Sequence, residues 1–174
     1  MNSNKKQLKW WQLALITMAV SVVGRLTAGR SAKPDQKIYT TKLKQAPWAP
    51  PAWVFAPAWG INNYFILLAL QRIWNMEDSA AKTKLLGMQA GIWLIFLSFN
   101  YIYFNKKSTV LAAAWTNADA VLAVTSFITA LKSDKKLAAF YLPLVAWTGF
   151  ASTVADYQAL TNRDQFLNTK ALLN

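Results

Sequence analysis

The segment that decides the fold runs from Ala46 to Trp59 and reads APWAPPAWVFAPAW. It holds three Trp and four Pro in fourteen residues, and it opens a stretch of 27 residues without a charge between Lys44 and Arg72. Such a stretch is long enough to cross a bilayer as a helix, which needs about 20 apolar residues. The sequence therefore predicts a membrane helix with a stiff, aromatic entrance.

The composition of the whole chain favours a membrane protein. Hydrophobic residues make up 55% of the 174 residues, and the charges gather in short stretches between long apolar runs. A soluble domain scatters its charges instead. Cysteine and histidine are absent, which excludes disulfides, thiolate or imidazole metal ligation and the commonest general base. We therefore expect no metal site.

The net charge of +12 fits two kinds of partner, nucleic acid and the lipid bilayer. The nineteen Lys and Arg lie mainly in the N-terminal tail and in the gaps between apolar runs. Basic residues at such places are typical of contact with lipid head groups. We therefore expect a lipid partner and no nucleic acid.

Five apolar segments follow one another, each close to the length of one membrane span. We expect helices at about 10–28, 53–76, 85–104, 108–131 and 137–162. The sequence thus predicts an all-α fold, a bundle of five transmembrane helices in a single membrane domain, residues 1–174, with its two ends on opposite sides. Lys and Arg number nine on the N-terminal side and ten on the other, so they leave the orientation and the identity of the membrane open.

The connection over residues 29–52 is the longest between two predicted helices. A loop longer than about 12–15 residues is commonly a lid or a binding loop, so we expect this one to cap a cavity. The first segment also fits a cleaved signal peptide, because Lys5, Lys6 and Lys9 precede it. Its length and the presence of Arg25 favour a retained helix.

Two Trp-containing stretches carry a resemblance to a known family. PWAPPAW at 47–53, continued by APAWG at 56–60, resembles the start of the second helix in the translocator protein family, also called tryptophan-rich sensory proteins or peripheral benzodiazepine receptors. LPLVAWTGFA at 142–151 resembles the fifth-helix pattern of that family. The resemblance covers nearly the whole chain and implies a five-helix membrane bundle, usually a homodimer.

The resemblance also implies a cavity beneath the first loop that binds tetrapyrroles such as porphyrin and haem, sterol-like lipids or flat aromatic drugs. Some bacterial members are associated with light-dependent porphyrin breakdown, for which Trp at the positions matching Trp59 and Trp147 are implicated. We carry these two residues over as candidates, without a firm catalytic assignment. Three positions depart from the family pattern and leave ligand specificity open. This chain has Asn63 where the family often has Tyr, Phe96 where it commonly has Asn, and Ala155 in the place where Leu-Asn is usual.

The residues themselves place a site in the same half of the bundle. Counted inward from the loop at about 1.5 Å per helical residue, Trp59 and several amides lie within about 15 Å of the entrance. Polar side chains in hydrocarbon need partners, so we expect Asn62, Asn63, Asn117 and Asp119 to face the interior or a wet cavity. Indole rings suit a flat ligand. The predicted ligand-binding residues are Trp48, Trp53, Trp59, Asn62, Asn63, Asn100, Asn117, Asp119, Trp147, Phe150 and Ala151.

Several of these aromatic residues also fit a purely structural role. Trp near helix ends is typical of the membrane interface, and this applies to Trp10, Trp11, Trp53 and Trp74. Trp48 fits either that belt or the lid. A packed core position is the alternative for Trp59 and Trp147.

The acidic residues of the apolar segments have two interpretations each. Asp119 lies mid-membrane and fits a ligand or proton site as well as a hydrogen bond between helices. Asp156 and Arg25 both lie near the loop side, and there we expect an ion pair that stabilises the bundle rather than catalysis.

Gly87 and Gly91 are four residues apart on the third predicted helix, a spacing that lets another backbone approach closely. Together with the resemblance, this spacing favours a homodimer that uses these two residues. Packing inside one chain is the alternative.

Functions from different classes therefore stay open. The first is a membrane receptor or carrier that holds a tetrapyrrole or a sterol-like ligand in a Trp-lined pocket, with no obligatory cofactor. The absence of histidine favours a metal-free porphyrin, or haem held without imidazole, with Tyr or Met ligation left open. The alternatives are a light-dependent porphyrin-degrading protein and a ligand-free packing or assembly subunit.

Overall fold

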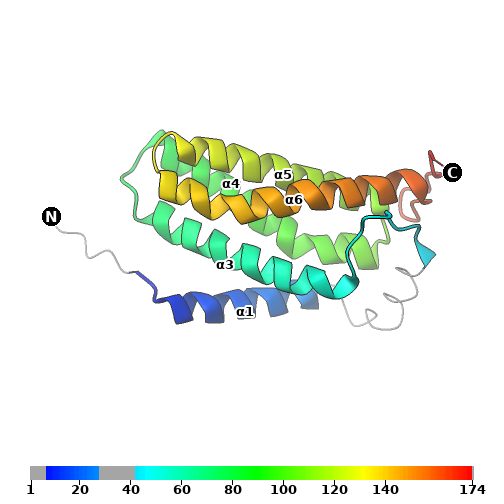
Figure 1. The fold of residues 1–174 in the computed structure, drawn as a ribbon, viewed down its shortest axis with the longest axis horizontal. Coiled ribbons are helices and arrows are strands. Elements are labelled where there is room, and N and C mark those ends of the chain that lie inside the picture. Colours follow the sequence, from blue (N-terminus) through cyan, green and yellow to red (C-terminus); the bar gives the residue numbers. More distant parts are fainter. Residues whose placement is uncertain (1–6, 28–41, 174) are drawn as a thin grey trace.

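The computed structural model describes residues 7–27 and 42–173, which form a bundle of antiparallel helices (Figure 1). The long helices are α1 (Trp10–Leu26), α3 (Phe55–Trp74), α4 (Ala80–Asn100), α5 (Thr109–Leu131) and α6 (Lys135–Thr161). A 3-10 turn, η1 (Ala52–Val54), leads into α3, and a π-helical turn, η2 (Tyr101–Asn105), prolongs α4. The described residues contain no strand, so the predicted all-α fold is confirmed.

The predicted helix boundaries agree with the structure to within about two residues, except at the start of α4. That helix was expected from residue 85 but begins at Ala80, because Ser79 caps it. The Ser79 hydroxyl accepts a hydrogen bond from the backbone N–H of Lys82 at 3.2 Å. Ser108 and Asp134 cap α5 and α6 in the same way.

Four helical segments are long and apolar enough to cross a membrane: η1 with α3, α4 with η2, α5, and α6. The fifth, α1, is apolar and has 17 residues, or about 26 Å at 1.5 Å per residue. That length is close to the ~30 Å hydrocarbon core of a bilayer. A helix satisfies its own backbone groups in lipid, so this architecture is that of a multi-pass membrane protein.

The helices form a ring in the order α1, α3, α6, α5 and α4, and each contacts its two neighbours. In addition α3 contacts α4 across the ring. The long axes of the helices run roughly parallel, with the start of α1 and the end of α6 at opposite ends of the bundle (Figure 1). We call the end at which α3 begins and α6 finishes the mouth.

Apolar and polar buried side chains occupy different halves of this ring. The continuous apolar core lies away from the mouth and consists of Ile66, Ala69, Ile73, Leu85, Met88, Ile92, Ala123, Ala130, Leu137, Ala138, Tyr141 and Leu144. Most of the buried polar residues lie in the mouth-side half, namely Asn62, Asn63, Ser108, Thr109, Thr116, Asp119, Thr148, Ser152, Gln158, Thr161, Asn162 and Asp164. Buried polar side chains are thus concentrated in the mouth-side half of the bundle.

Candidate ligand-binding site

The described end of the long loop is docked on the last turns of α6. The backbone of Lys44 exchanges two hydrogen bonds with the side chain of Asn162. One turn earlier, the Nε2 of Gln158 donates to the Oε1 of Gln45 at 2.6 Å. Residues 28–41 lie outside the described part of the chain, so the structure describes only the second half of the predicted lid loop.

Trp48, in this docked segment, lies against α6. Its indole Nε1 donates to the hydroxyl of Thr153 at 3.1 Å, and its ring meets Tyr157 edge-on with the centroids 5.4 Å apart. These contacts dock Trp48 on α6, and half of its surface stays exposed. Trp53, in contrast, is 74% exposed, which is typical of a belt residue.

Trp147 projects from α6 toward the start of α3. Its ring lies edge-on to Phe55 with the centroids 5.5 Å apart, and Phe150 packs on it at 6.1 Å. The indole Nε1 is buried and has no hydrogen-bond acceptor among the described residues. An unpaired buried donor is costly, so this group is a candidate to meet an acceptor on a ligand. Ala151, one turn on, is half-buried.

Trp59 lies one turn after Phe55 on α3 and packs toward α4. Its ring centroid is 5.4 Å from that of Phe96, which in turn meets Trp93 edge-on at 6.0 Å. Gly24 on α1 leaves the space for this group, since a Cβ there would come within 2.9 Å of the Phe96 ring. Trp59 also packs against the apolar core, so part of its surface is already covered by protein.

Three polar side chains with unpaired buried atoms lie at similar depths below the mouth. The Nδ2 of Asn63, both carboxylate oxygens of Asp119 and the hydroxyl of Ser152 are buried without a hydrogen-bond partner among the described residues. Counted from the mouth-side end of each helix at 1.5 Å per residue, they lie about 12–15 Å deep. Asn62 and Asn63 are buried as expected, and Asp119 makes no hydrogen bond to another helix within residues 7–27 and 42–173.

Two expectations about polar residues near the mouth are wrong. Asn117 does not face the interior but is exposed, and its Nδ2 donates to Asp156 at 2.7 Å and to the carbonyl of Ala113 at 2.9 Å. Ion pairs in the described part of the chain join Arg72 to Asp134 and Lys82 to Asp78, so Arg25 and Asp156 do not pair. Asp156 is instead satisfied by the neighbouring helix α5.

Asn100 has a structural role in the described part of the chain, because its Nδ2 donates to the carbonyl of Gly24 at 2.8 Å and ties α4 to α1. Phe150 is 38% exposed beside Trp147.

On α4, Gly91 packs inside the chain, where a Cβ would meet Leu122 at 2.9 Å, while Gly87 has open space around it. Internal packing thus accounts for Gly91, while Gly87 is exposed.

Sequence reasoning missed the residues of α6 that dock the loop. Thr153 and Tyr157 are four residues apart, as are Gln158 and Asn162, so each pair shares a face of the helix. Polar residues at this spacing near the end of an otherwise apolar helix were the available signal. Phe55 was also missed, since nothing in its surroundings distinguishes it from other apolar residues.

Comparison with known proteins places this arrangement in context. The sequence profile of the TspO/MBR family matches residues 13–158. A relative named tryptophan-rich protein TspO, from Chlorobaculum tepidum, is 24% identical over 144 residues, which is 80% of this chain and 89% of that protein. A tryptophan-rich sensory protein from Cereibacter sphaeroides is 24% identical over 154 residues, 86% and 90% of the two chains.

Proposed function

Because this chain belongs to the TspO/MBR family and is a multi-pass membrane protein of the sensory or receptor kind, we propose that it binds a tetrapyrrole or a similar planar, hydrophobic ligand at the mouth-side half. Porphyrin is the first candidate, haem and sterol-like lipids the next. The ligand lies among Trp147, Phe55 and Trp59, and the docked loop segment around Trp48 covers it. The protein acts as a receptor or carrier.

The observation that carries this proposal is the buried indole N–H of Trp147, which has no acceptor among the described residues. Buried donors are nearly always paired, and a porphyrin supplies acceptors in its carboxylates and ring nitrogens. The edges of Phe55 and Phe150 beside the indole provide an apolar wall for a flat macrocycle. The unpaired groups of Asn63, Asp119 and Ser152 offer further contacts to a polar rim.

The test is a titration of the purified protein in nanodiscs with protoporphyrin IX in the dark. Binding is followed by the absorbance of the porphyrin, because nine Trp make quenching hard to assign to one site. Trp147→Phe keeps an aromatic ring but removes the N–H, and we expect about two- to tenfold weaker binding, the value of one hydrogen bond. Trp74→Phe is the matched control, since Trp74 is 71% exposed at the other end of the bundle.

Equal affinity of Trp147→Phe and wild type would refute the role given to the indole. Binding of no planar ligand at micromolar concentration would favour a packing or assembly subunit. Illumination of the bound porphyrin distinguishes degradation from binding alone. If the porphyrin absorbance bands are lost in light, and this loss disappears when Trp59 or Trp147 is replaced, the protein degrades its ligand.

The homodimer is a further part of this proposal. Gly87 lies on α4 with open space around it, so a second copy can approach the backbone closely there. We expect Gly87→Leu to shift the protein toward the monomer in light scattering of the detergent-solubilised protein. Gly60→Leu on α3 is the control, as Gly60 also has open space around it, and an equal effect of the two would argue against this interface.

A further inference from the structure

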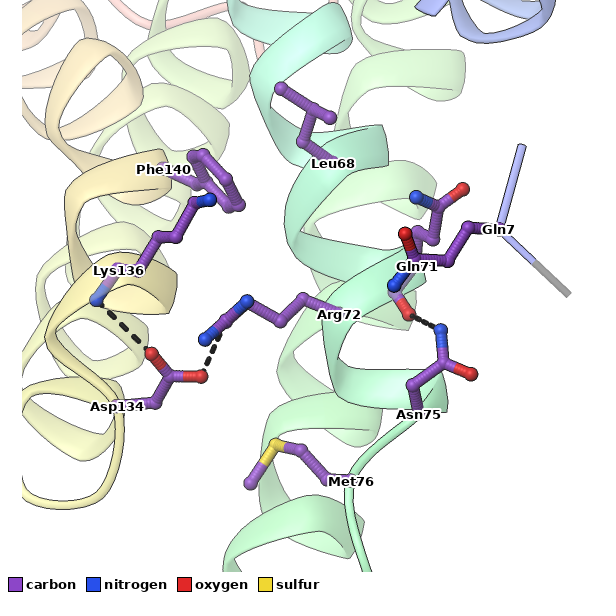
Figure 2. Close-up of a pocket in the computed structure, with 9 residues that line it drawn as sticks. All are labelled: Gln7, Leu68, Gln71, Arg72, Asn75, Met76, Asp134, Lys136 and Phe140. Carbon is purple, nitrogen blue, oxygen red and sulfur yellow. Dashed lines mark hydrogen bonds and ion pairs between the residues drawn. The ribbon is translucent and has the colours of Figure 1, made fainter. Parts of the chain in front are cut away.

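A pocket of about 470 Å³ lies at the end of the bundle opposite the mouth, between the end of α3, the start of α6 and the segment before α1 (Figure 2). It is lined by Gln7, Leu68, Gln71, Arg72, Asn75, Met76, Asp134, Lys136 and Phe140. Its volume is within the ~300–1,000 Å³ typical of small-molecule sites. The residues proposed to hold a planar ligand lie at the mouth, so this pocket is a separate site.

The polar lining of the pocket is rich in hydrogen-bond donors. Arg72 uses its Nε–H for Asp134, and its terminal nitrogens donate to no residue that the structure describes. Lys136 is exposed, and in Figure 2 its side chain extends toward Phe140 and away from Asp134. Gln71 accepts at its Oε1 from the backbone N–H of Leu8 at 2.8 Å, which leaves its amide N–H groups as donors.

The one carboxylate of the pocket does not oppose an anion there. One oxygen of Asp134 accepts from Arg72, and the other accepts from the backbone N–H groups of Lys136 and Leu137, both at 3.1 Å. Its negative charge is thus balanced by the ion pair with Arg72 and by the N-terminal N–H groups of α6 that it caps. The Lys136 ammonium and the free face of the Arg72 guanidinium remain to attract an anion.

The depth of the pocket matches the headgroup region of a bilayer. Exposed Trp side chains mark the membrane interface at this end, with Trp74 at 71% and Trp10 at 73% exposure. The charged residues Arg72 and Lys136 lie within the terminal turns of their helices. Leu68 and Phe140 lie about 6 Å further toward the membrane centre along their helices, so the helix positions that line the pocket change from charged to apolar along the direction in which a phospholipid changes from headgroup to acyl chain.

We propose that this pocket binds the headgroup of an anionic phospholipid, with the phosphate held by Arg72, Lys136 and the amide of Gln71, and the glycerol and upper acyl chain against Leu68 and Phe140. A free phosphate ion presents the same oxygens but has no apolar part that would contact Leu68 and Phe140. A guanidinium and an ammonium at the interface are the groups that recognise lipid phosphate. The site is independent of what the mouth binds.

The experiment is native mass spectrometry of the full-length protein in detergent with added phosphatidylglycerol or phosphatidylcholine. We expect the wild type to retain one phosphatidylglycerol more strongly than phosphatidylcholine, and to keep it when inorganic phosphate is added at the same concentration. Lys136→Gln and Arg72→Gln should each lower retention about fivefold or more, the effect of one basic residue near anionic lipid. Lys135→Gln is the matched control, because it removes the same charge from the neighbouring residue outside the pocket lining.

The proposal is overturned if phosphatidylcholine is retained as well as phosphatidylglycerol, or if Lys135→Gln is as harmful as Lys136→Gln, which indicates diffuse attraction to the basic surface. Displacement of the lipid by equimolar inorganic phosphate assigns the pocket to a free anion and also overturns it. Arg72→Gln removes the ion-pair partner of Asp134 and can affect folding. Lys136 is exposed and forms no ion pair in the described chain, so Lys136→Gln keeps the test decisive in that case.

Discussion

Lys44 and Asn162, 118 residues apart in the sequence, are joined by two hydrogen bonds. The backbone N–H of Lys44 donates to the Oδ1 of Asn162 at 2.7 Å, and the Nδ2 of Asn162 donates back to the Lys44 carbonyl at 3.0 Å. The side-chain amide of Asn162 therefore accepts from and donates to the backbone of Lys44, the same exchange of two hydrogen bonds that joins paired residues of antiparallel β-strands. This contact holds the second half of the long loop against the end of α6, beside Trp48.

Asn162→Ala should release residues 42–51 from α6. Each lost hydrogen bond is worth about 0.5–1.5 kcal/mol, so we expect amide exchange in that segment to become about tenfold faster or more. Hydrogen–deuterium exchange with mass spectrometry measures this directly. Asn75→Ala makes the same change at the opposite end and should leave residues 42–51 unaffected, whereas unchanged exchange in Asn162→Ala would show that other contacts hold the segment.

Gly24→Ala should destabilise the bundle. The added Cβ would lie 2.9 Å from the Phe96 ring, and that ring is held in place by Trp59 and Trp93. Overpacking of this kind costs about 1–3 kcal/mol, more than the ~0.5–1 kcal/mol gained by replacing a helical Gly with Ala. Thermal unfolding in detergent measures the change.

The control for this prediction is Gly60→Ala, because a Cβ at Gly60 meets nothing within 4 Å. We expect that variant to be neutral or slightly stabilised. Adding Phe96→Leu to Gly24→Ala should restore part of the lost stability. If Gly24→Ala and Gly60→Ala unfold at the same temperature, the close approach of α1 to Phe96 does not occur.

Asp119→Leu should stabilise the protein and weaken porphyrin binding. Both carboxylate oxygens of Asp119 are buried without partners, and an unsatisfied polar group costs about 1–3 kcal/mol. We therefore expect the thermal midpoint to rise by about 2–12 °C, while the affinity for protoporphyrin falls. Asp156→Leu is the matched control, because Asp156 accepts a hydrogen bond from Asn117 and its loss should not stabilise. A fall in stability of Asp119→Leu would contradict this account.

Asp164, just after α6, should make the stability of the protein depend on pH in the acid range. Burial raises the pKa of this carboxyl, but hydrogen bonds from the N–H of Leu167, the hydroxyl of Ser108 and the N–H of Val110 outweigh burial and hold the pKa below 3.8. Its contribution is therefore fully present above pH 3.8 and is lost as the pH falls through the lower folded value.

Asp164→Asn tests this dependence. The amide N–H₂ group cannot accept from these donors, so the variant should be less stable at neutral pH by about 1–3 kcal/mol. The difference from the wild type in thermal midpoint should shrink as the pH is lowered below 3.8. A difference that stays constant down to pH 3 would mean that the Asp164 charge contributes nothing.

The helices could be predicted from the sequence because each span is a long apolar run bounded by charges, and a helix is the only open-ended structure that satisfies its backbone in lipid. The start of α4 was misplaced because Ser79 lies in a charged stretch, where hydropathy gives no signal and a cap decides the boundary. The burial of Asn62, Asn63 and Asp119 followed from the cost of polar groups in hydrocarbon.

The parts of the site that were not predicted depend on the rotation of helices and on pairing across the ring. Asn117 lies on α5 only two residues before the buried Asp119, yet it is exposed, because two residues correspond to about 200° of rotation. Depth along a helix could be counted from the sequence, but direction could not. The pairing of Asp156 with Asn117 rather than Arg25 depends on which helices are neighbours, and α1 does not contact α6.

Helix α6 crosses the membrane once, so the 132–134 connection before it and the segment after it lie in different aqueous compartments. The chain has no cysteine, so a single thiol introduced at Ser133, and another in a separate variant at Thr169, would each be the sole target for a membrane-impermeant maleimide. Both positions are exposed. In intact cells or sealed vesicles only one of the two would react, and that one reports which way round the protein is inserted.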